Sequence, residues 1–173
     1  MPLRSDWSDR PCTIARGIDV LGDPWSLLIL REAFGGATRF EGFSRHTGIT
    51  DKALSGRLKT MTENGLLERV DGPSGARPRA EYRLTQAGAD ALPVLHAFAL
   101  WAEQHAPNVE LGRLGINCRA CGARARSADT CRTCGRDLDV TNTRWTWAGS
   151  RDGEQVDLDS ALDNLEDKQL ASR

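Results

Sequence analysis

The chain has 173 residues, of which 39% are hydrophobic and 27% are charged, and its formal net charge is −1. This composition is ordinary for a soluble globular protein and excludes collagen-like and intrinsically disordered chains. The longest apolar run, residues 25–30, falls far short of the roughly 20 residues that span a bilayer. The first ten residues are polar and do not resemble a secretion signal. We therefore expect a cytoplasmic protein without a membrane partner.

Charge is distributed unevenly along the chain. Residues 1–109 carry 13 basic and 13 acidic side chains, residues 110–136 carry 6 and 2, and residues 137–173 carry 4 and 9. A protein that binds nucleic acid usually has a basic excess, and the whole chain has none. Any affinity for DNA must therefore come from the local placement of basic residues.

Two helices are expected near the N-terminus. Residues 12–21 repeat apolar side chains at helical spacing, and Gly22 and Asp23 then interrupt the pattern. Pro24 suits the first position of the next helix, because the N–H that proline lacks would be unpaired there. This second helix, residues 25–34, is apolar on almost every side and should be the buried centre of a domain. The apolar face of the first helix consists of Ile14, Ala15, Ile18 and Leu21.

A helix-turn-helix is expected between residues 39 and 64. Residues 39–46 predict a short helix, and a turn at residues 47–49 leads into a longer one. The longer helix has marked ends, because Thr50 is a good N-cap and Asn64 followed by glycine is a good stop. One side is apolar and the other is polar, so we interpret it as a recognition helix. The apolar side holds Ile49, Leu54, Leu58 and Met61, and the polar side holds Lys52, Ser55, Gly56, Lys59 and Glu63.

A β-hairpin is expected after this helix. Residues 66–70 and 81–84 predict its strands, and the loop between them contains two glycines and two prolines. Such a loop is too long for a tight turn and suits an exposed tip. Arg77 and Arg79 lie in it, where they would touch phosphates or enter a minor groove. The predicted fold class is mainly α, a winged helix-turn-helix with a small β-hairpin wing.

A long helix is expected from its N-cap Thr85 to about His105. Pro93 lies inside this range and should kink the helix, because proline removes a backbone hydrogen bond. The helix has little left to bury against in its own small domain, so we expect a second subunit to cover it. Its apolar stripe consists of Leu92, Leu95, Phe98, Ala99 and Ala102.

Several of these segments together carry a family resemblance. They are Cys12 to Ala15, Gly22 to Arg31 (GDPWSLLILR), Arg39-Phe40, Gly48-Ile49, Leu54 to Leu58 (LSGRL), Gly65-Leu66, and Tyr82 to Thr85 with Gly88. On these residues, positions 12–105 resemble the HxlR-type winged helix-turn-helix transcriptional regulators. The resemblance implies a cytoplasmic homodimer that binds double-stranded DNA and dimerises through its first and last helices. The family does not usually include the cysteine region, so residues 108–173 are interpreted from their chemistry alone.

The DNA-binding residues are expected on the polar face of the predicted recognition helix and at the wing. Serine and lysine can hydrogen-bond base edges, and Gly56 would let the helix approach DNA closely. Arg57 lies nearer the apolar side and suits either a phosphate contact or an internal ion pair. The alternative for the whole face is a merely solvated helix surface, which the family resemblance disfavours. The candidate residues are Thr50, Lys52, Ser55, Gly56, Arg57, Lys59, Arg77 and Arg79.

A metal site is expected from the cysteines. The chain has five, and an odd number without a secretion signal favours a metal site and a free thiol over a disulfide framework. Two CxxC pairs, each followed by glycine, can present their thiolates to one tetrahedral Zn²⁺. We therefore predict a small C-terminal β zinc ribbon with one structural zinc per chain; disulfides, rubredoxin-like iron and a redox-active pair are the alternatives. The predicted ligands are Cys118, Cys121, Cys131 and Cys134.

Basic and aromatic residues surround the predicted ribbon. The arginines could contact DNA phosphates, dock a protein partner such as transcription machinery, or simply keep a small module soluble, and the sequence favours none of these. Residues 144–147 alternate like a final ribbon strand, and their tryptophans are expected to cover the metal site rather than stack on bases. The arginines are Arg113, Arg119, Arg124, Arg126, Arg132 and Arg136.

Cys12 stands alone at a predicted helix start, a position that favours a thiolate. Some HxlR-type proteins sense electrophiles or oxidants through a cysteine near this point, so Cys12 is a candidate redox sensor; the alternative is a small packing residue. His46, His96 and His105 show no ligand or catalytic spacing, and no nucleotide-binding or hydrolase motif occurs. We therefore do not expect an enzyme.

Three regions are predicted: a DNA-binding and dimerisation domain at residues 1–107, the zinc ribbon at 108–150, and an acidic tail at 151–173 with at most one short helix. The favoured function is a sequence-specific transcriptional regulator that binds a pseudo-palindromic operator as a homodimer and responds to a small molecule or a redox signal. The main alternative is a protein-interaction module whose ribbon docks a partner without specific DNA reading. A redox enzyme using its CxxC pairs is a third class.

Overall fold

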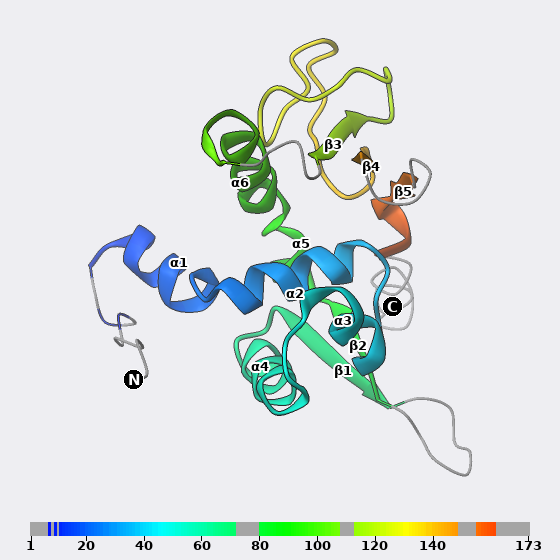
Figure 1. The fold of residues 1–173 in the computed structure, drawn as a ribbon. Coiled ribbons are helices and arrows are strands. Elements are labelled where there is room, and N and C mark those ends of the chain that lie inside the picture. The colour runs from blue at the N-terminus through cyan, green and yellow to red at the C-terminus, as the bar shows by residue number, and fades with distance from the viewer. Residues whose placement is uncertain are drawn as a thin grey trace, which may run out of the picture. The chain divides into compact units, whose positions relative to one another are not determined.

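The computed structural model describes residues 7, 9, 11–71, 80–107, 113–148 and 155–161. By their internal contacts these residues divide into two compact units, one within residues 1–33 and 37–83 and the other within residues 34–36 and 84–173. The fold is a mostly helical winged helix-turn-helix with small antiparallel sheets, which confirms the predicted fold class (Figure 1). The domain boundary predicted at residue 107 does not coincide with this division by contacts.

The helices of the N-terminal half begin and end close to their predicted limits. Asp23 starts the second helix, because its carboxylate accepts the N–H of Trp25 at 2.9 Å and Pro24 follows it as the first helical residue. This helix holds the fully buried Ile29 and Leu30, as its apolar sequence predicts. In chain order the helices are α1 (Thr13–Leu21), α2 (Pro24–Phe34), α3 (Phe40–Thr47) and α4 (Asp51–Glu63).

The turn between α3 and α4 forms as predicted. Gly48 has φ +68°, a left-handed conformation that glycine adopts without strain, and it ends α3. Thr50 is the N-cap of α4 and accepts the N–H of Ala53 at 3.4 Å. Gly65 is also left-handed and ends α4, and the N–H of Leu66 then bonds back to the Met61 carbonyl.

The wing is an antiparallel pair of β1 (Leu67–Asp71) and β2 (Ala80–Leu84). The N–H of Tyr82 in β2 donates to the carbonyl of Thr38 at 2.7 Å, which ties the wing to the segment before α3. An ion pair between Arg39 and Glu81 at 3.1 Å reinforces this link. Residues 72–79, which contain Arg77 and Arg79, lie outside the described residues.

The prediction of one long kinked helix from Thr85 to His105 is wrong. Thr85 caps only the short α5 (Gln86–Ala89), and a separate helix, α6 (Leu92–His105), starts after Ala91. Pro93 lies in the first turn of α6 rather than in a helix interior. Proline is favoured there because its missing N–H is not needed, so the sequence marks a new helix start rather than a kink.

The C-terminal sheet contains three strands, in the order β3–β4–β5. All pairs are antiparallel, and β3 pairs with β4 so that Ile116 lies opposite Trp145 and Cys118 opposite Thr143. The third strand and the following turn of 3₁₀ helix fall in the region predicted as an acidic tail, and Leu158 in that turn is fully buried. The elements are β3 (Arg113–Cys118), β4 (Thr143–Ala148), β5 (Gln155–Asp157) and η2 (Leu158–Ala161).

Each unit has its own apolar core. The first unit buries residues of α2, α3, α4 and β1, among them Ile29, Phe43, Leu58 and Leu67. The second buries Leu92 and Leu95 of α6 together with ribbon residues such as Trp145. Among the residues that the structure describes, no helix is both long enough and apolar enough to cross a membrane.

Candidate nucleic-acid interface and metal centre

The polar face predicted for the recognition helix is present on α4. Leu54, Leu58 and Met61 are buried with exposed fractions of 0 to 1%. The side chains predicted for the opposite face all lie at the surface. These exposed residues are Lys52, Ser55, Gly56, Lys59 and Glu63, and the N-cap Thr50 is exposed as well.

Gly56 lies in the middle of this exposed face. A Cβ atom added at this position would meet nothing within 4 Å. Packing against the residues that the structure describes therefore does not require glycine here, although glycine in a helix interior is about 1 kcal/mol less favourable than alanine. Its small size matters only to something that approaches α4 from outside.

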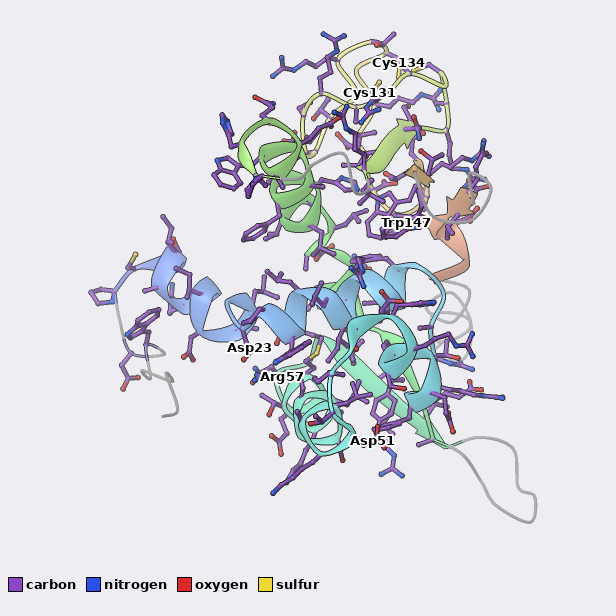
Figure 2. All side chains as sticks on the ribbon, in the orientation of Figure 1. Asp23, Asp51, Arg57, Cys131, Cys134 and Trp147 are labelled. Carbon is purple, nitrogen blue, oxygen red and sulfur yellow. The ribbon has the colours of Figure 1, made fainter. Side chains whose placement is uncertain are left out.

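Arg57 forms an internal ion pair, which is one of its two predicted roles. Its guanidinium forms an ion pair with the carboxylate of Asp23 at 2.5 Å, and both side chains are partly buried (Figure 2). The same carboxylate caps α2. Arg57 therefore connects the recognition helix to the start of the central helix and holds α4 in place.

Two helices expose apolar side chains that a soluble monomer would normally cover. On α1, Ile14 is 73% exposed and Ile18 is 47% exposed. On α6, Val94, Phe98 and Trp101 are exposed at i, i+4 and i+7 spacing, which is one stripe of the helix. Cys12 is an exposed free thiol at the N-cap of α1.

The four predicted metal ligands converge. The sulfur atoms of Cys118, Cys121, Cys131 and Cys134 all lie within 4.8 Å of one another. Cys118 and Cys134 approach to 3.7 Å, and Cys121 and Cys131 approach to 3.6 Å. Tetrahedral zinc with bonds of about 2.3 Å separates its sulfurs by about 3.8 Å, so the donor set and its spacing fit this ion.

Both CxxC turns have the same backbone. The N–H of Gly122 donates to the Cys118 carbonyl, and the N–H of Gly135 donates to the Cys131 carbonyl, each at 2.8 Å. Gly122 has φ +73° and Gly135 has φ +74°, which explains why glycine follows each pair. This repeated geometry presents two sulfurs of each turn to a common centre.

The electrostatics of the cluster favour a bound cation. Backbone N–H groups of Cys134 and Thr133 lower the pKa of the Cys131 thiol to about 6. The Ala123 N–H favours the Cys121 thiolate, but burial and the neighbouring thiols outweigh it and raise the pKa of Cys121 to about 12. Adjacent thiols cannot all ionise unless a positive charge compensates them, and a dication supplies that charge.

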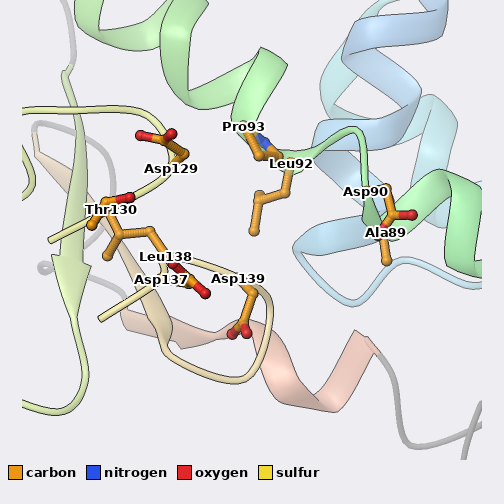
Figure 3. Close-up of a pocket in the computed structure, with 9 residues that line it drawn as sticks. All are labelled: Ala89, Asp90, Leu92, Pro93, Asp129, Thr130, Asp137, Leu138 and Asp139. Atoms are coloured by element: carbon orange, nitrogen blue, oxygen red, sulfur yellow. The ribbon is translucent and has the colours of Figure 1, made fainter. Parts of the chain in front are cut away.

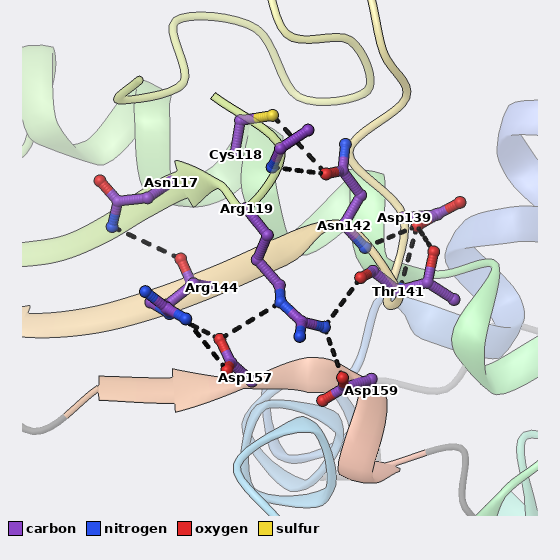
Figure 4. Close-up of polar contacts among 10 residues, drawn as sticks. Asn117, Cys118, Arg119, Asp139, Thr141, Asn142, Arg144, Asp157 and Asp159 are labelled. Carbon is purple, nitrogen blue, oxygen red and sulfur yellow. Dashed lines mark hydrogen bonds and ion pairs between the residues drawn. The ribbon is translucent and has the colours of Figure 1, made fainter. Parts of the chain in front are cut away.

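A polar network supports the first CxxC turn (Figure 4). The side-chain oxygen of Asn142 accepts the N–H of Ala120 at 3.1 Å and lies 3.7 Å from the Cys118 sulfur. The N–H groups of Thr141 and Asn142 in turn donate to the carboxylate of Asp139. Opposite Cys118, the buried hydroxyl of Thr143 has no hydrogen-bond partner in the described part of the chain. Polar groups of this kind commonly surround thiolate metal sites and orient their ligands.

Half of the ribbon arginines form ion pairs within the second unit. Arg124 pairs with Glu103 of α6 at 2.7 Å, and Arg113 pairs with the same carboxylate at 3.6 Å. Arg119 bonds to Thr141 at 2.9 Å and pairs with Asp159 (Figure 4). The remaining arginines are all exposed and lie before, within and just after the second CxxC turn. They are Arg126, Arg132 and Arg136.

The sequence did not single out His96, which is fully buried on α6. Its Nδ1 lies 2.8 Å from the Ala128 carbonyl, and its Nε2 accepts the indole N–H of Trp145 at 3.1 Å. Burial lowers the pKa of His96 to about 4, although the hydrogen bond to Ala128 acts in the opposite direction. The available signal was its position beside Leu92 and Leu95 on one apolar stripe.

Trp145 has packing partners that the sequence did not predict. Its ring is fully buried and packs edge-on against Phe34 and His96, with ring centres 5.8 and 6.0 Å apart. Trp147, which is partly exposed, packs edge-on against Trp145 (Figure 2). The predicted strand is thus confirmed as β4, but Trp145 joins the ribbon to α6.

A pocket of about 270 Å³ lies where the α5–α6 turn meets the ribbon loops (Figure 3). Its lining combines four carboxylates with apolar residues that include Leu92, Pro93 and Leu138. One carboxylate, Asp90, already accepts the Gln86 amide at 2.8 Å. The acidic residues are Asp90, Asp129, Asp137 and Asp139.

The chain is similar to known regulators. A model of the family described as HxlR-like helix-turn-helix matches residues 20–110. Rv3095 of Mycobacterium tuberculosis, an uncharacterized HTH-type transcriptional regulator, is 36% identical over 131 residues, which cover 75% of this chain and 82% of the relative. Residues 1–107 are less than two thirds of this chain, so the similarity extends past them.

Solved structures show the same similarity. PA1374 of Pseudomonas aeruginosa, a candidate transcription factor, is 35% identical to this chain. The match covers 74% of this chain and 86% of PA1374, with a TM-score of 0.50. The redox regulator HypR in its oxidized form is 26% identical to this chain. The match covers 54% of this chain and 97% of the HypR chain, with a TM-score of 0.51.

Proposed function

The chain belongs to the HxlR-like helix-turn-helix family of DNA-binding transcriptional regulators, and we propose that it binds a pseudo-palindromic operator as a homodimer, with α4 of each subunit in a major groove. The observation that carries this proposal is the fully exposed polar face of α4 around Gly56. Because operator DNA lies in the cytoplasm, this is where we expect the protein to act.

The proposed contacts on α4 follow from its chemistry. Ser55 can hydrogen-bond a base edge, and Gly56 lets the helix backbone approach the groove floor. Lys52 and Lys59 supply positive charge, although Lys59 also lies 3.8 Å from Glu63. Thr50 caps the helix and can donate to a phosphate. Arg77 and Arg79 of the wing are proposed to contact the adjacent minor groove or phosphates.

The proposed dimer uses the exposed apolar faces of α1 and α6. Ile14 and Ile18 form one face, and Val94, Phe98 and Trp101 form the other. Burying such side chains contributes about 1.5–3 kcal/mol each, which is ample to hold two copies together. The dimer also supplies a second recognition helix, which a chain with a net charge of −1 needs for useful affinity.

A binding titration on DNA tests this function. The full chain should bind duplex DNA from its own promoter region more tightly than random DNA, and the affinity should fall as salt rises. Lys59→Ala should weaken binding, whereas Lys168→Ala, in the predicted acidic tail, should not. Equal affinity for promoter and random DNA would contradict the regulator and favour the alternative, in which the ribbon docks a protein partner.

We also propose that Cys118, Cys121, Cys131 and Cys134 hold one structural zinc per chain. The convergence of their sulfurs supports this site, and a closed four-thiolate site leaves no open position for catalysis. Metal analysis of the reduced protein should give close to one zinc per chain. Cys134→Ser should lower that ratio, and Cys12→Ser, at the remaining cysteine, is the matched control that should not.

The signal is proposed to be a small molecule or an oxidant. Cys12 is an exposed thiol at the N-cap of α1, next to the proposed dimer contact. HypR, one of the similar structures, is a redox regulator. Treating the protein with an electrophile should change DNA affinity in the wild type and not in Cys12→Ser. The same response in both proteins would exclude Cys12 as the sensor.

A further inference from the structure

The buried ring of His96 on α6 is held by two separate segments of the ribbon. Its Nε2 accepts the Trp145 indole N–H at 3.1 Å, and its Nδ1 lies 2.8 Å from the Ala128 carbonyl. An indole N–H can only donate, so the proton of the neutral ring is on Nδ1 and is donated to Ala128. His96 thus requires one fixed acceptor and one fixed donor, which come from different parts of the ribbon.

The hydrogen-bond donor to His96, the Trp145 indole, belongs to the strand pair that leads to the first CxxC turn. Trp145 in β4 lies opposite Ile116 in β3, and two residues later β3 ends at Cys118. The segment before β4 is also tied to this turn, because the Arg119 N–H donates to the Asn142 carbonyl at 2.9 Å. The position of the Trp145 indole therefore follows the position of the first CxxC turn.

The hydrogen-bond acceptor from His96, the Ala128 carbonyl, belongs to the segment that leads to the second CxxC turn. Ala128 lies three residues before Cys131. The next residue, Asp129, accepts the N–H of Leu138 at 2.7 Å, and Thr130 forms a β-bridge with Asp137. These contacts connect the segment before the second turn to the segment after it. The position of the Ala128 carbonyl therefore depends on the position of that turn.

A metal at the cysteine site would join the two turns. Each close sulfur pair, Cys118 with Cys134 and Cys121 with Cys131, takes one atom from each turn. Without a cation, only sulfur–sulfur contacts of 3.6 to 3.7 Å join the turns at these positions, which favours separation of the turns. His96 bridges the same two segments at their other end, so its two hydrogen bonds both form only when the turns are held together.

We propose that the four-cysteine site, besides its structural role, is a second input of this regulator beside Cys12, and that its occupancy by a thiolate-binding divalent metal is transmitted through His96 to the dimer helix α6. This inference rests on the metal site and the dimer contact of the proposed function. When the metal leaves, His96 loses its paired partners, and the inner face of α6, with Leu92 and Leu95, loses its cover. The outer stripe of α6 then no longer has a fixed backbone from which to bind a second copy.

The packing between α6 and the ribbon makes this transmission effective. A pocket of about 270 Å³ lies beside the contact, lined by Leu92 and Pro93 on one side and by Asp129 and Leu138 on the other. The pocket leaves part of this contact unfilled, so the buried hydrogen bonds of His96 matter more to it than they would in a densely packed core.

Hydrogen exchange on the full chain tests the inference. Reduced, zinc-loaded protein is compared with chelator-treated protein, and amides of α6 (residues 92–105) are followed beside those of α4 (residues 51–63). We expect α6 amides to exchange at least tenfold faster after zinc removal and α4 amides to change less than twofold. His96→Phe should still bind zinc with a much smaller α6 response, whereas His105→Phe, at the exposed histidine of the same helix, should behave like the wild type.

Three outcomes would overturn the inference. If the protein binds zinc but α6 exchanges equally with and without it, the metal site stands and the transmission is wrong. If α4 loses protection as much as α6, zinc stabilises the whole chain and carries no specific signal. If the reduced protein binds no zinc at all, both the proposed metal site and this inference fail. Reciprocity adds a further check, since His96→Phe should also lower zinc affinity.

Discussion

The indole N–H of Trp145 donates to Nε2 of His96 at 3.1 Å, and both side chains are fully buried. This bond connects a strand of the cysteine ribbon to α6, a helix whose opposite face carries exposed apolar side chains. It requires a neutral histidine, because a proton on Nε2 would face the indole N–H with a second donor. The charge state of one side chain thus controls how the ribbon and α6 pack together.

Stability should depend on pH through His96. Burial lowers its pKa to about 4 in the folded protein, against about 6.5 when unfolded. Between these values the unfolded chain binds a proton that the folded chain does not, so the free energy of unfolding should fall as pH drops from about 6.5 to 4, by up to about 3 kcal/mol. Above pH 6.5 both states are neutral and this contribution is constant.

Urea unfolding of the zinc-loaded protein at pH 7 and pH 5 measures this effect. His96→Gln can keep one donor and one acceptor in place but does not titrate. The difference in stability between the two pH values should therefore be smaller in His96→Gln than in the wild type. An identical pH dependence in both proteins would show that other groups, such as the thiols, are responsible.

Gly56→Ala should separate stability from DNA binding. The added methyl group has open space and a better helix propensity, so the free energy of unfolding should rise by about 1 kcal/mol. The same methyl group would stand between α4 and DNA, so the affinity for DNA should fall. Thermal unfolding and a DNA titration of the same preparation provide both values.

Thr62→Ala is the matched control for Gly56→Ala. It also improves helix propensity in α4, and its hydroxyl donates to the Leu58 carbonyl of its own helix at 2.8 Å. Thr62 is partly buried and lies near the C-terminal end of α4, so its substitution should leave DNA affinity unchanged. If Gly56→Ala also leaves it unchanged, the face around Gly56 does not approach DNA closely.

Arg57 should act on DNA binding through Asp23. Asp23→Asn keeps a side chain that can cap α2 but removes the charge that Arg57 meets at 2.5 Å. Unfolding of the two single variants and the double variant, Asp23→Asn with Arg57→Gln, should show a coupling of about 0.5–1 kcal/mol, because the pair is only partly buried. Both single variants should weaken DNA binding to a similar degree.

If Arg57 instead contacts a DNA phosphate directly, the two variants should differ in how their DNA affinity depends on salt. Arg57→Gln alone would then reduce the slope of log affinity against log salt by about 1, and Asp23→Asn would not. Salt titrations of both variants distinguish the two roles that the sequence left open.

Substituting the exposed apolar residues should produce monomers. Ile14→Asp and Phe98→Asp each place a charge in the proposed dimer contact, which should weaken association about 100-fold or more. Sedimentation velocity over a range of protein concentrations measures this. Ser44→Asp adds the same charge on α3 and should leave the dimer intact; if all three variants stay dimeric, α1 and α6 do not form the interface.

The sequence by itself determined the local structure of the first unit and the four cysteines that converge in the second. Helices α1 to α4 follow from apolar spacing and from their end signals, Asp23-Pro24, Thr50 and Gly65, because these act within a few residues of the backbone they control. The four cysteines were identified together because CxxC spacing is itself a short-range geometric constraint.

Only the tertiary structure decided how these elements are used. Pro93 proved to start a helix rather than kink one, and β5 joined the ribbon sheet from a segment too polar to suggest a strand. The choice of Asp23 as the partner of Arg57, and the burial of His96 against Ala128 and Trp145, depend on residues that are 32 to 49 positions apart. Periodicity along the chain carries no information about such pairs, because they form only when separate elements pack and exclude water.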